Sequence, residues 1–120
     1  MSVREEMLKE YLAGFQSMDP ERSLRAAAPD FHILDGALEA PVSRADFPDY
    51  MLGWDDRMKA LGGTGRYEVS DEVVQDLDDC LLRWAWWKFI GTDIEGSALV
   101  KVTHDGVAYA KFAYFKTPGA

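Results

Sequence analysis

The stretch that decides the fold reads Arg83-Trp84-Ala85-Trp86-Trp87-Lys88-Phe89. Its aromatic and aliphatic side chains occur on both faces of an extended segment, and from Arg66 onward the pattern has a period of two, which is typical of β-strands. Turn signals, among them Asp105-Gly106, separate the period-two segments. We therefore predict four antiparallel strands over about 66–76, 80–90, 95–104 and 107–115.

The chain before these strands has helical spacing instead. Apolar side chains recur every four residues from Val3 to Phe15, which predicts a helix that ends near Ser17. Asp19-Pro20 predicts the start of a short second helix that continues through Ala28.

A single strand and a third helix complete the first half. The stretch 31–35 is too short for a helix and predicts a strand with Asp35 at its exit. Asp46 is expected to cap a third helix that Gly62-Gly63 ends. Helices followed by a meander predict an α+β domain over residues 1–120, with three helices packed on one face of a curved sheet.

The amino-acid composition excludes several classes of function. The chain has 120 residues, 13 Lys and Arg against 21 Asp and Glu, and a net charge of −8. This charge disfavours nucleic acid and anionic membrane surfaces as partners. Cys80 is the only cysteine, which excludes an intrachain disulfide and a cysteine-based zinc site. The charged N-terminal segment has no signal-peptide pattern, and no nucleotide or metal motif is visible, so we expect a soluble cytoplasmic protein without a cofactor.

The faces of the sheet follow if Thr92-Asp93 and Asp105-Gly106 are two-residue turns. Val100 then lies opposite Ala85 and Lys111, and a bulge in a strand would exchange the faces. The expected inner face carries Arg83, Ala85, Trp87, Phe89, Ala98, Val100, Val102, Tyr109, Lys111 and Ala113. The other face is also aromatic, which favours a cover from a second subunit. We therefore expect a homodimer through the face that bears Trp84, Trp86 and Phe112.

This order of elements resembles the cone-shaped fold of the nuclear transport factor two-like superfamily, in which helices and a strongly curved antiparallel sheet enclose a pocket. The superfamily includes SnoaL-like polyketide cyclases and ketosteroid isomerase, together with members that only bind or assemble. The closest local match is to ketosteroid isomerase, over residues 10–14 and 31–35. Fold alone does not supply a function.

The resemblance implies roles for two residues. Tyr11 matches a helix-one tyrosine that donates a hydrogen bond to the substrate oxygen, and Asp35 matches an aspartate that shuttles the proton. Val100 stands where the family has a second, protonated acid donor, and Lys111 is a substitute donor in the predicted register. Asp35 also fits a plain turn in which its carboxylate accepts backbone N–H groups, and Tyr11 fits a core phenol with an ordinary partner such as Tyr50.

We expect a cofactor-independent enzyme that moves a proton in a small hydrophobic carbonyl compound, by isomerisation or cyclisation, with Asp35 as base and Tyr11 as oxyanion donor. The expected substrate-binding residues are Tyr50, Met51, Trp54, Met58, Arg83, Ala85, Trp87, Phe89, Val100, Val102 and Lys111. The alternatives are a dimeric ligand-binding or assembly module without catalysis, and a dehydratase-like or epoxide-opening enzyme. No metal is expected, because the two histidines lack clustered acidic partners.

Overall fold

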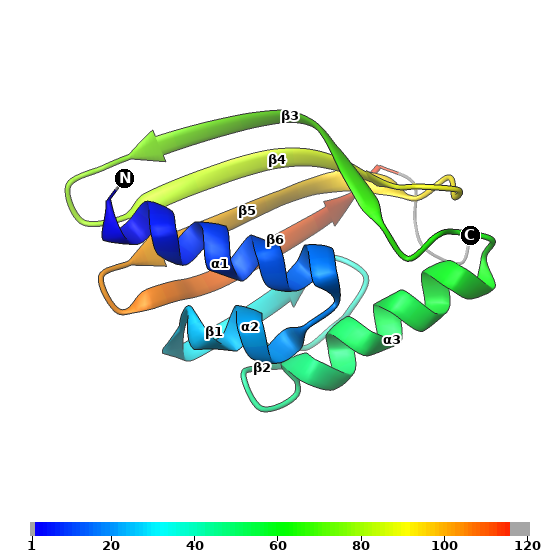
Figure 1. Cartoon of the computed structure of the whole chain (residues 1–120), viewed down its shortest axis with the longest axis horizontal. Helices are drawn as coiled ribbons and strands as arrows, with labels where there is room; N and C mark the ends of the chain where they lie inside the picture. Colours follow the sequence, from blue (N-terminus) through cyan, green and yellow to red (C-terminus); the bar gives the residue numbers. More distant parts are fainter. Residues whose placement is uncertain (1, 116–120) are drawn as a thin grey trace.

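Three helices and a six-stranded sheet make up the computed structural model, which describes residues 2–115. The helices are α1 (Val3–Ser17), α2 (Pro20–Arg25) and α3 (Phe47–Ala60). The strands are β1 (Ala27–Asp35), β2 (Val42–Ser43), β3 (Tyr67–Asp76), β4 (Leu81–Phe89), β5 (Glu95–Thr103) and β6 (Gly106–Tyr114), in the order β2-β1-β6-β5-β4-β3. Figure 1 shows the long strands curving around α1, with α3 at the far side of α2. The α+β class and the four-stranded meander are confirmed.

Local signals set the helix starts, with one exception. Ser2 and Glu5 form a capping box at α1, and the side chain of Asp19 accepts a hydrogen bond from the backbone N–H of Arg22 at α2. The predicted cap at Asp46 is wrong in its chemistry. Asp46 precedes α3 but makes no side-chain capping bond, and its own backbone N–H donates to the hydroxyl of Ser43.

The first strand is longer than predicted and is parallel to its neighbour. Helix α2 ends at Arg25, and β1 begins at Ala27 instead of Phe31. The backbone N–H of Val107 donates to the carbonyl of Ala26, so pairing with β6 begins where the helix was expected to continue. Because β1 and β6 run parallel, the sheet is mixed and not wholly antiparallel as predicted. The short β2 lies in a segment expected to be a loop.

The hairpin between β4 and β5 has a longer turn than predicted. Strands β4 and β5 pair Arg83 with Val100 and Ala85 with Ala98, so the connection spans residues 90–93. The hydroxyl of Thr92 donates to the carbonyl of Phe89 and accepts from a backbone N–H inside this turn. The predicted partners are therefore displaced by two residues. A displacement of two keeps every side chain on its predicted face.

The hairpin between β5 and β6 contains a bulge that exchanges the faces of β6. Val102 pairs with Val107, but Lys101 then pairs with Tyr109, which leaves Ala108 as the extra residue. Beyond this bulge, Phe112 and Tyr114 point inward, while Lys111 points outward. The predicted inward positions of Tyr109 and Lys111, and the outward position of Phe112, are therefore wrong.

Lys111 consequently has no place at the inner face. Its strand partner is Leu99, and its ammonium lies 5.0 Å from the centre of the Tyr109 ring on the outer face. A cation over an aromatic face is a favourable contact at the protein surface. Lys111 therefore does not replace the donor that the resemblance expects near Val100.

The core lies between α1, α3 and the concave face of the sheet. Its buried members come from every long element except β3, whose side chains are nearly all exposed. The largest are Tyr11, Phe31, Ile33, Phe47 and Met51. Edge-to-face contacts join the rings of Phe31 and Phe47 at 5.2 Å, and such pairs add to the free energy of area burial. None of the described helices is long and apolar enough to cross a membrane.

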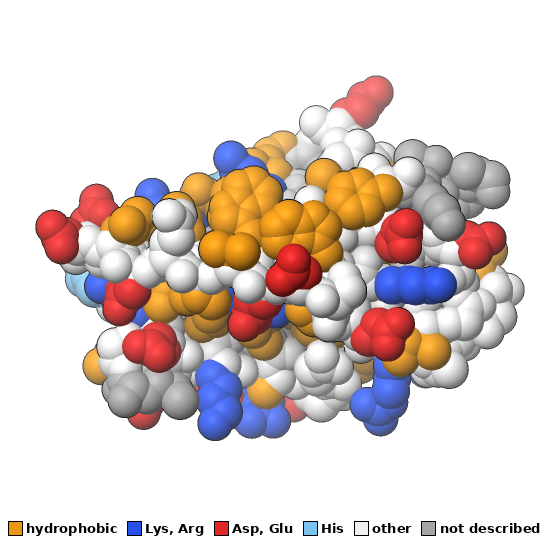
Figure 2. Space-filling view, turned by 90° about the horizontal axis from the view of Figure 1, so that it is seen from above, with side chains coloured by type: hydrophobic (Ala, Val, Ile, Leu, Met, Phe, Trp, Pro, Cys, Tyr) orange, Lys and Arg blue, Asp and Glu red, His pale blue; other side chains and the backbone are white. Residues whose placement is uncertain are grey.

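The outer face of the sheet carries aromatic side chains that the rest of the described chain does not cover. Trp84 is 41% exposed, and Val73 beside it on β3 is 47% exposed. Figure 2 looks onto the top of Figure 1, where β3 lies, and shows hydrophobic side chains gathered on this surface among acidic ones. Phe112 does not belong to this face, so the predicted dimer surface keeps only its two tryptophans, Trp84 and Trp86.

Homodimer formation through this outer face stays a prediction. Trp84→Glu is expected to convert a dimer to a monomer, because an interface would strip water from the new carboxylate. Light scattering coupled to gel filtration measures the mass of the particle. Val3→Glu, at an apolar side chain of α1 that is 64% exposed, is the matched control and should remain dimeric. A monomeric unmodified protein contradicts the prediction.

Substitution of two helical glycines by alanine should change the free energy of unfolding in opposite directions. A Cβ on Gly14 of α1 would lie 2.6 Å from the backbone nitrogen of Ser23 and would also overlap its hydroxyl, whereas a Cβ on Gly53 of α3 meets nothing within 4 Å. Gly14→Ala should therefore lower the free energy of unfolding by about 2 kcal/mol or more. Gly53→Ala should raise it by about 0.5–1 kcal/mol, because alanine has the higher helix propensity. Urea unfolding measures both values, and equal effects would contradict the close approach of α1 and α2.

Candidate functional site

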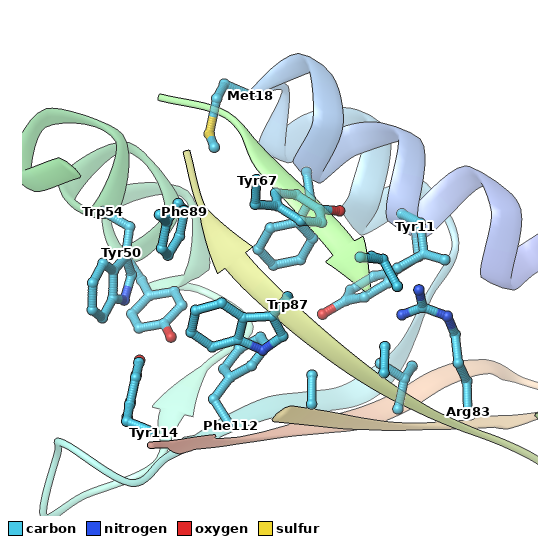
Figure 3. Close-up of a pocket in the computed structure, with 16 residues that line it drawn as sticks. Tyr11, Met18, Tyr50, Trp54, Tyr67, Arg83, Trp87, Phe89, Phe112 and Tyr114 are labelled. Carbon is cyan, nitrogen blue, oxygen red and sulfur yellow. The ribbon is translucent and has the colours of Figure 1, made fainter. Parts of the chain in front are cut away.

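A cavity lies between the helices and the concave face of the sheet. Its volume is about 80 Å³ and it is partly open to solvent. Most of its wall is aromatic or aliphatic, and Figure 3 shows the side chains that converge on it. The lining residues are Tyr11, Leu12, Phe15, Met18, Tyr50, Trp54, Tyr67, Val69, Arg83, Ala85, Trp87, Phe89, Ala98, Val100, Phe112 and Tyr114.

The structure brings many of the expected binding residues to this cavity and leaves others out. Those that line it are Tyr11, Tyr50, Trp54, Arg83, Ala85, Trp87, Phe89 and Val100. Met51, Met58 and Val102 are buried but do not line it, and Lys111 lies on the outer face. Sequence reasoning missed Phe112 and Tyr114 as lining residues. The only signal for them was the register of β6, which the bulge changes.

Asp35 ends β1 and is 5% exposed. One carboxylate oxygen, Oδ1, accepts a hydrogen bond of 2.8 Å from the backbone N–H of Ala37. The other, Oδ2, accepts from the hydroxyls of Tyr50 at 2.6 Å and Tyr114 at 2.8 Å. The plain turn and the link to the cavity are therefore both present. The carboxylate itself lies behind the two phenols, which line the cavity wall.

Three elements meet at this carboxylate. Tyr50 comes from the first half of α3 and Tyr114 from the end of β6. Parallel pairing of Asp35 with Phe112 places Tyr114, two residues further on, beyond the end of β1 on the same face. Charge-assisted hydrogen bonds of this kind are short and strong, and a buried carboxylate needs them.

Burial keeps both phenols protonated. It raises the pKa of Tyr50 far above the usual value near 10, with the nearby Tyr114 and Asp35 adding to the effect. Burial also raises the pKa of Tyr114, and the hydrogen bond to Asp35 raises it further because the phenol is the donor. Both side chains therefore remain neutral donors to Asp35 at physiological pH.

Two buried donors in the cavity wall have no hydrogen-bond partner within residues 2–115. They are the hydroxyl of Tyr11 and the indole Nε1 of Trp87. Tyr11 is 1% exposed, and its burial raises its pKa well above the usual value. The expected pairing of Tyr11 with Tyr50 is wrong, since Tyr50 donates to Asp35. An unpartnered buried donor is costly and calls for an explanation.

Arg83 brings a positive charge to the same part of the cavity. The residue is 6% exposed, and its Nε donates to a carboxylate oxygen of Glu72 on β3. Figure 3 shows the guanidinium reaching toward Tyr11, on the side of the cavity away from Tyr50 and Tyr114. Arg83 therefore pairs with Glu72. No group of three or more metal-ligating side chains is found among the described residues.

Solved structures share this architecture. A candidate ketosteroid isomerase from Parabacteroides distasonis matches with a TM-score of 0.67 and 12% identity, over 96% of this chain and 89% of that chain. An NTF2-like protein of unknown function from Cytophaga hutchinsonii matches with a TM-score of 0.60 and 10% identity, over 95% and 91%. The chain has the NTF2-like fold.

A third match is TerC, which was co-crystallised with polyporic acid. It has a TM-score of 0.68 and 14% identity, over 94% of this chain and 92% of that chain. No family model matches the chain, and no curated protein matches its sequence. At these identities the likeness is one of fold, and it confirms at that level the resemblance predicted from the order of elements.

Removal of the hydroxyl should have opposite effects on stability at Tyr11 and at Tyr50. Tyr11→Phe removes an unpartnered hydroxyl and should raise the free energy of unfolding by about 1 kcal/mol. Tyr50→Phe takes a donor from the buried carboxylate of Asp35 and should lower it by about 1.5–3 kcal/mol. Urea unfolding of the two variants, which lose the same atom, is the measurement. Comparable destabilisation by both would show that the Tyr11 hydroxyl has a partner in the folded chain.

Proposed function

We propose that the protein is an enzyme that moves a proton within a flat, hydrophobic carbonyl compound bound in the aromatic cavity. Tyr11 donates a hydrogen bond to the carbonyl oxygen, and Asp35 receives the proton. Tyr50 and Tyr114 connect Asp35 to the cavity. The observation that carries the proposal is the pair of unpartnered buried donors, Tyr11 and Trp87, in a wall that also holds the phenols bound to a buried carboxylate.

The donor side of the cavity suits a developing negative charge. A carbonyl oxygen that becomes an enolate gains more from preorganised donors in an apolar site than it would in water. The Tyr11 hydroxyl and the Trp87 N–H are fixed by packing before any ligand enters, because both atoms are buried. The guanidinium of Arg83 adds a positive field nearby. Trp87 thus takes the place of the acid that the resemblance expects near Val100.

The acid–base side requires a path for the proton. The carboxylate of Asp35 lies behind the hydroxyls of Tyr50 and Tyr114, so the proton passes along their hydrogen bonds. A phenol oxygen takes the proton from the ligand while its own proton moves to Oδ2, and the reverse transfer returns a proton to another ligand atom. No net charge is left on either phenol at any stage.

A second candidate function is ligand binding without turnover. The observation that favours it is the set of three donors already bound to Asp35, two phenols and one backbone N–H. A carboxylate that already accepts three hydrogen bonds has few lone pairs left to accept a proton from a ligand. The same cavity would then hold its ligand through Tyr11 and the aromatic wall.

Hydrogen–deuterium exchange in a small enone tests the catalytic proposal. Cyclohex-2-enone has two carbons whose protons the carbonyl acidifies, and proton NMR in D2O reports their exchange separately. The protein should accelerate exchange, and Asp35→Asn should lower the accelerated rate by about 10²-fold or more, the usual contribution of a general base. The amide of this variant keeps an oxygen that can accept from Ala37.

Asp78→Asn is the matched control, since Asp78 is an exposed carboxylate in the turn before β4 and should leave exchange unchanged. Binding of the enone is followed in the same samples by ligand-observed NMR. Saturable binding of the enone without faster exchange would show that the protein binds its ligand and does not turn it over. Acceleration that survives in Asp35→Asn would overturn the assignment of the base.

A further inference from the structure

Four polar atoms of the cavity wall fall into two pairs of opposite character. The Tyr11 hydroxyl and the Trp87 N–H have no hydrogen-bond partner within residues 2–115, so both can donate to a ligand. The hydroxyls of Tyr50 and Tyr114 already donate to Asp35. Figure 3 shows the Tyr50 and Tyr114 hydroxyls on one side of the Trp87 ring, and Tyr11 with Arg83 on the other. The cavity therefore has a donor end and an acceptor end.

The acceptor end follows from the direction of two hydrogen bonds. A phenol has one proton to donate and oxygen lone pairs that accept. The protons of Tyr50 and Tyr114 are both committed to the same oxygen of Asp35, at 2.6 and 2.8 Å. What the two oxygens can still offer to a ligand is their lone pairs. Neither phenol can reverse its role without leaving a buried carboxylate short of a donor.

The wall between the two ends is aromatic. Trp54 stacks on Phe89 and on Tyr114, with ring centres 5.8 Å apart in both cases, and Trp87 meets the edges of Phe89 and Tyr114. Apart from the Tyr114 hydroxyl and the indole N–H groups of Trp54 and Trp87, these side chains offer only apolar surface, and the Trp54 N–H is directed to the oxygen of Tyr50. The middle of the ligand is therefore expected to be a flat ring without polar substituents.

We propose that the ligand is a flat conjugated compound with a carbonyl oxygen at one end and a hydroxyl group at the other. The carbonyl accepts from Tyr11 and Trp87, and the hydroxyl donates its single proton to one phenol oxygen of the acceptor end, that of Tyr114 or Tyr50. The carbonyl end rests on the proposed function, and the hydroxyl end is new. With the hydroxyl in place, one unbroken chain of hydrogen bonds runs from the ligand to Asp35.

The same arrangement rejects close analogues. A carboxylate at the acceptor end would face phenol lone pairs and the charge of Asp35, which repel it. An ether in place of the hydroxyl brings an oxygen without a proton against those lone pairs. A ligand that has a hydroxyl in place of the carbonyl is a poor acceptor for Tyr11 and Trp87 at the donor end. Specificity of this kind arises from buried polar groups that the wrong ligand leaves unpaired.

Three single-ring probes separate the two ends, and the cavity volume of about 80 Å³ requires small ones. Acetophenone carries only the carbonyl group, 4-ethylphenol carries only the hydroxyl group, and 4-hydroxyacetophenone carries both. Dissociation constants come from ligand-observed NMR titration. We expect 4-hydroxyacetophenone to bind about three- to tenfold more tightly than acetophenone, the range that one net hydrogen bond provides. Its methyl ether, 4-methoxyacetophenone, should lose that gain.

Two phenylalanine variants assign each end to its residue. Tyr11→Phe should weaken acetophenone and 4-hydroxyacetophenone about three- to tenfold and leave 4-ethylphenol unchanged. Tyr114→Phe should weaken only the two probes with a hydroxyl, and Tyr50→Phe is a second variant of the same end. Unchanged binding of acetophenone to Tyr114→Phe serves as its folding control.

Equal affinity for acetophenone and 4-hydroxyacetophenone would overturn the hydroxyl end, and so would a uniform loss across all probes in Tyr114→Phe. Either result can occur while the enone exchange remains dependent on Asp35, in which case the proposed function stands without this ligand class. In the opposite case, 4-hydroxyacetophenone binds more tightly than acetophenone but the enone shows no exchange. That result supports the ligand class and contradicts the catalytic step.

Discussion

The buried carboxylate of Asp35 is the group on which the arrangement of the cavity depends. A charge that is 5% exposed is stable only when donors surround it, and here the donors come from α3, β6 and the turn after β1. Its hydrogen bonds fix how α3 lies over the sheet and which way two phenols point. Because Tyr50 and Tyr114 also line the cavity, the same bonds define the chemical character of one end of the site.

The bulge at Ala108 makes this arrangement possible. In an unbulged β6, Tyr114 would point away from Asp35 and Lys111 would point into the cavity. One extra residue exchanges these positions, replacing a cation with a neutral phenol at the inner face. A bulge of this sort re-aims side chains near functional sites without changing the order of strands.

The donor end of the cavity, unlike the end at Asp35, has polar groups that do not stabilise the fold. Tyr11 is packed against Phe15 and Phe31 by edge-to-face contacts, so its ring is a stable part of the core. Its hydroxyl, like the indole N–H of Trp87, finds no partner in the described part of the chain. The phenols at Asp35 therefore stabilise the fold, whereas the donors at the other end reduce its stability and are suited to a ligand oxygen. The two ends of one cavity thus make opposite contributions to the stability of the fold.

The sequence by itself determined the fold class, the three helices and the four long strands, because hydrophobic period and capping residues act over a few neighbouring positions. It also placed Asp35 at a strand end and Tyr11 on a buried helix face. It did not determine the parallel pairing of β1 with β6, the four-residue turn at 90–93 or the bulge at Ala108, since each depends on hydrogen bonds with a distant or shifted partner. Only the tertiary structure decided that Tyr114 joins Asp35, that Lys111 does not reach the cavity and that Tyr11 and Trp87 keep free donors. A displacement of one residue in register reverses the face of every side chain that follows it, and the local pattern of an aromatic strand is the same in either register.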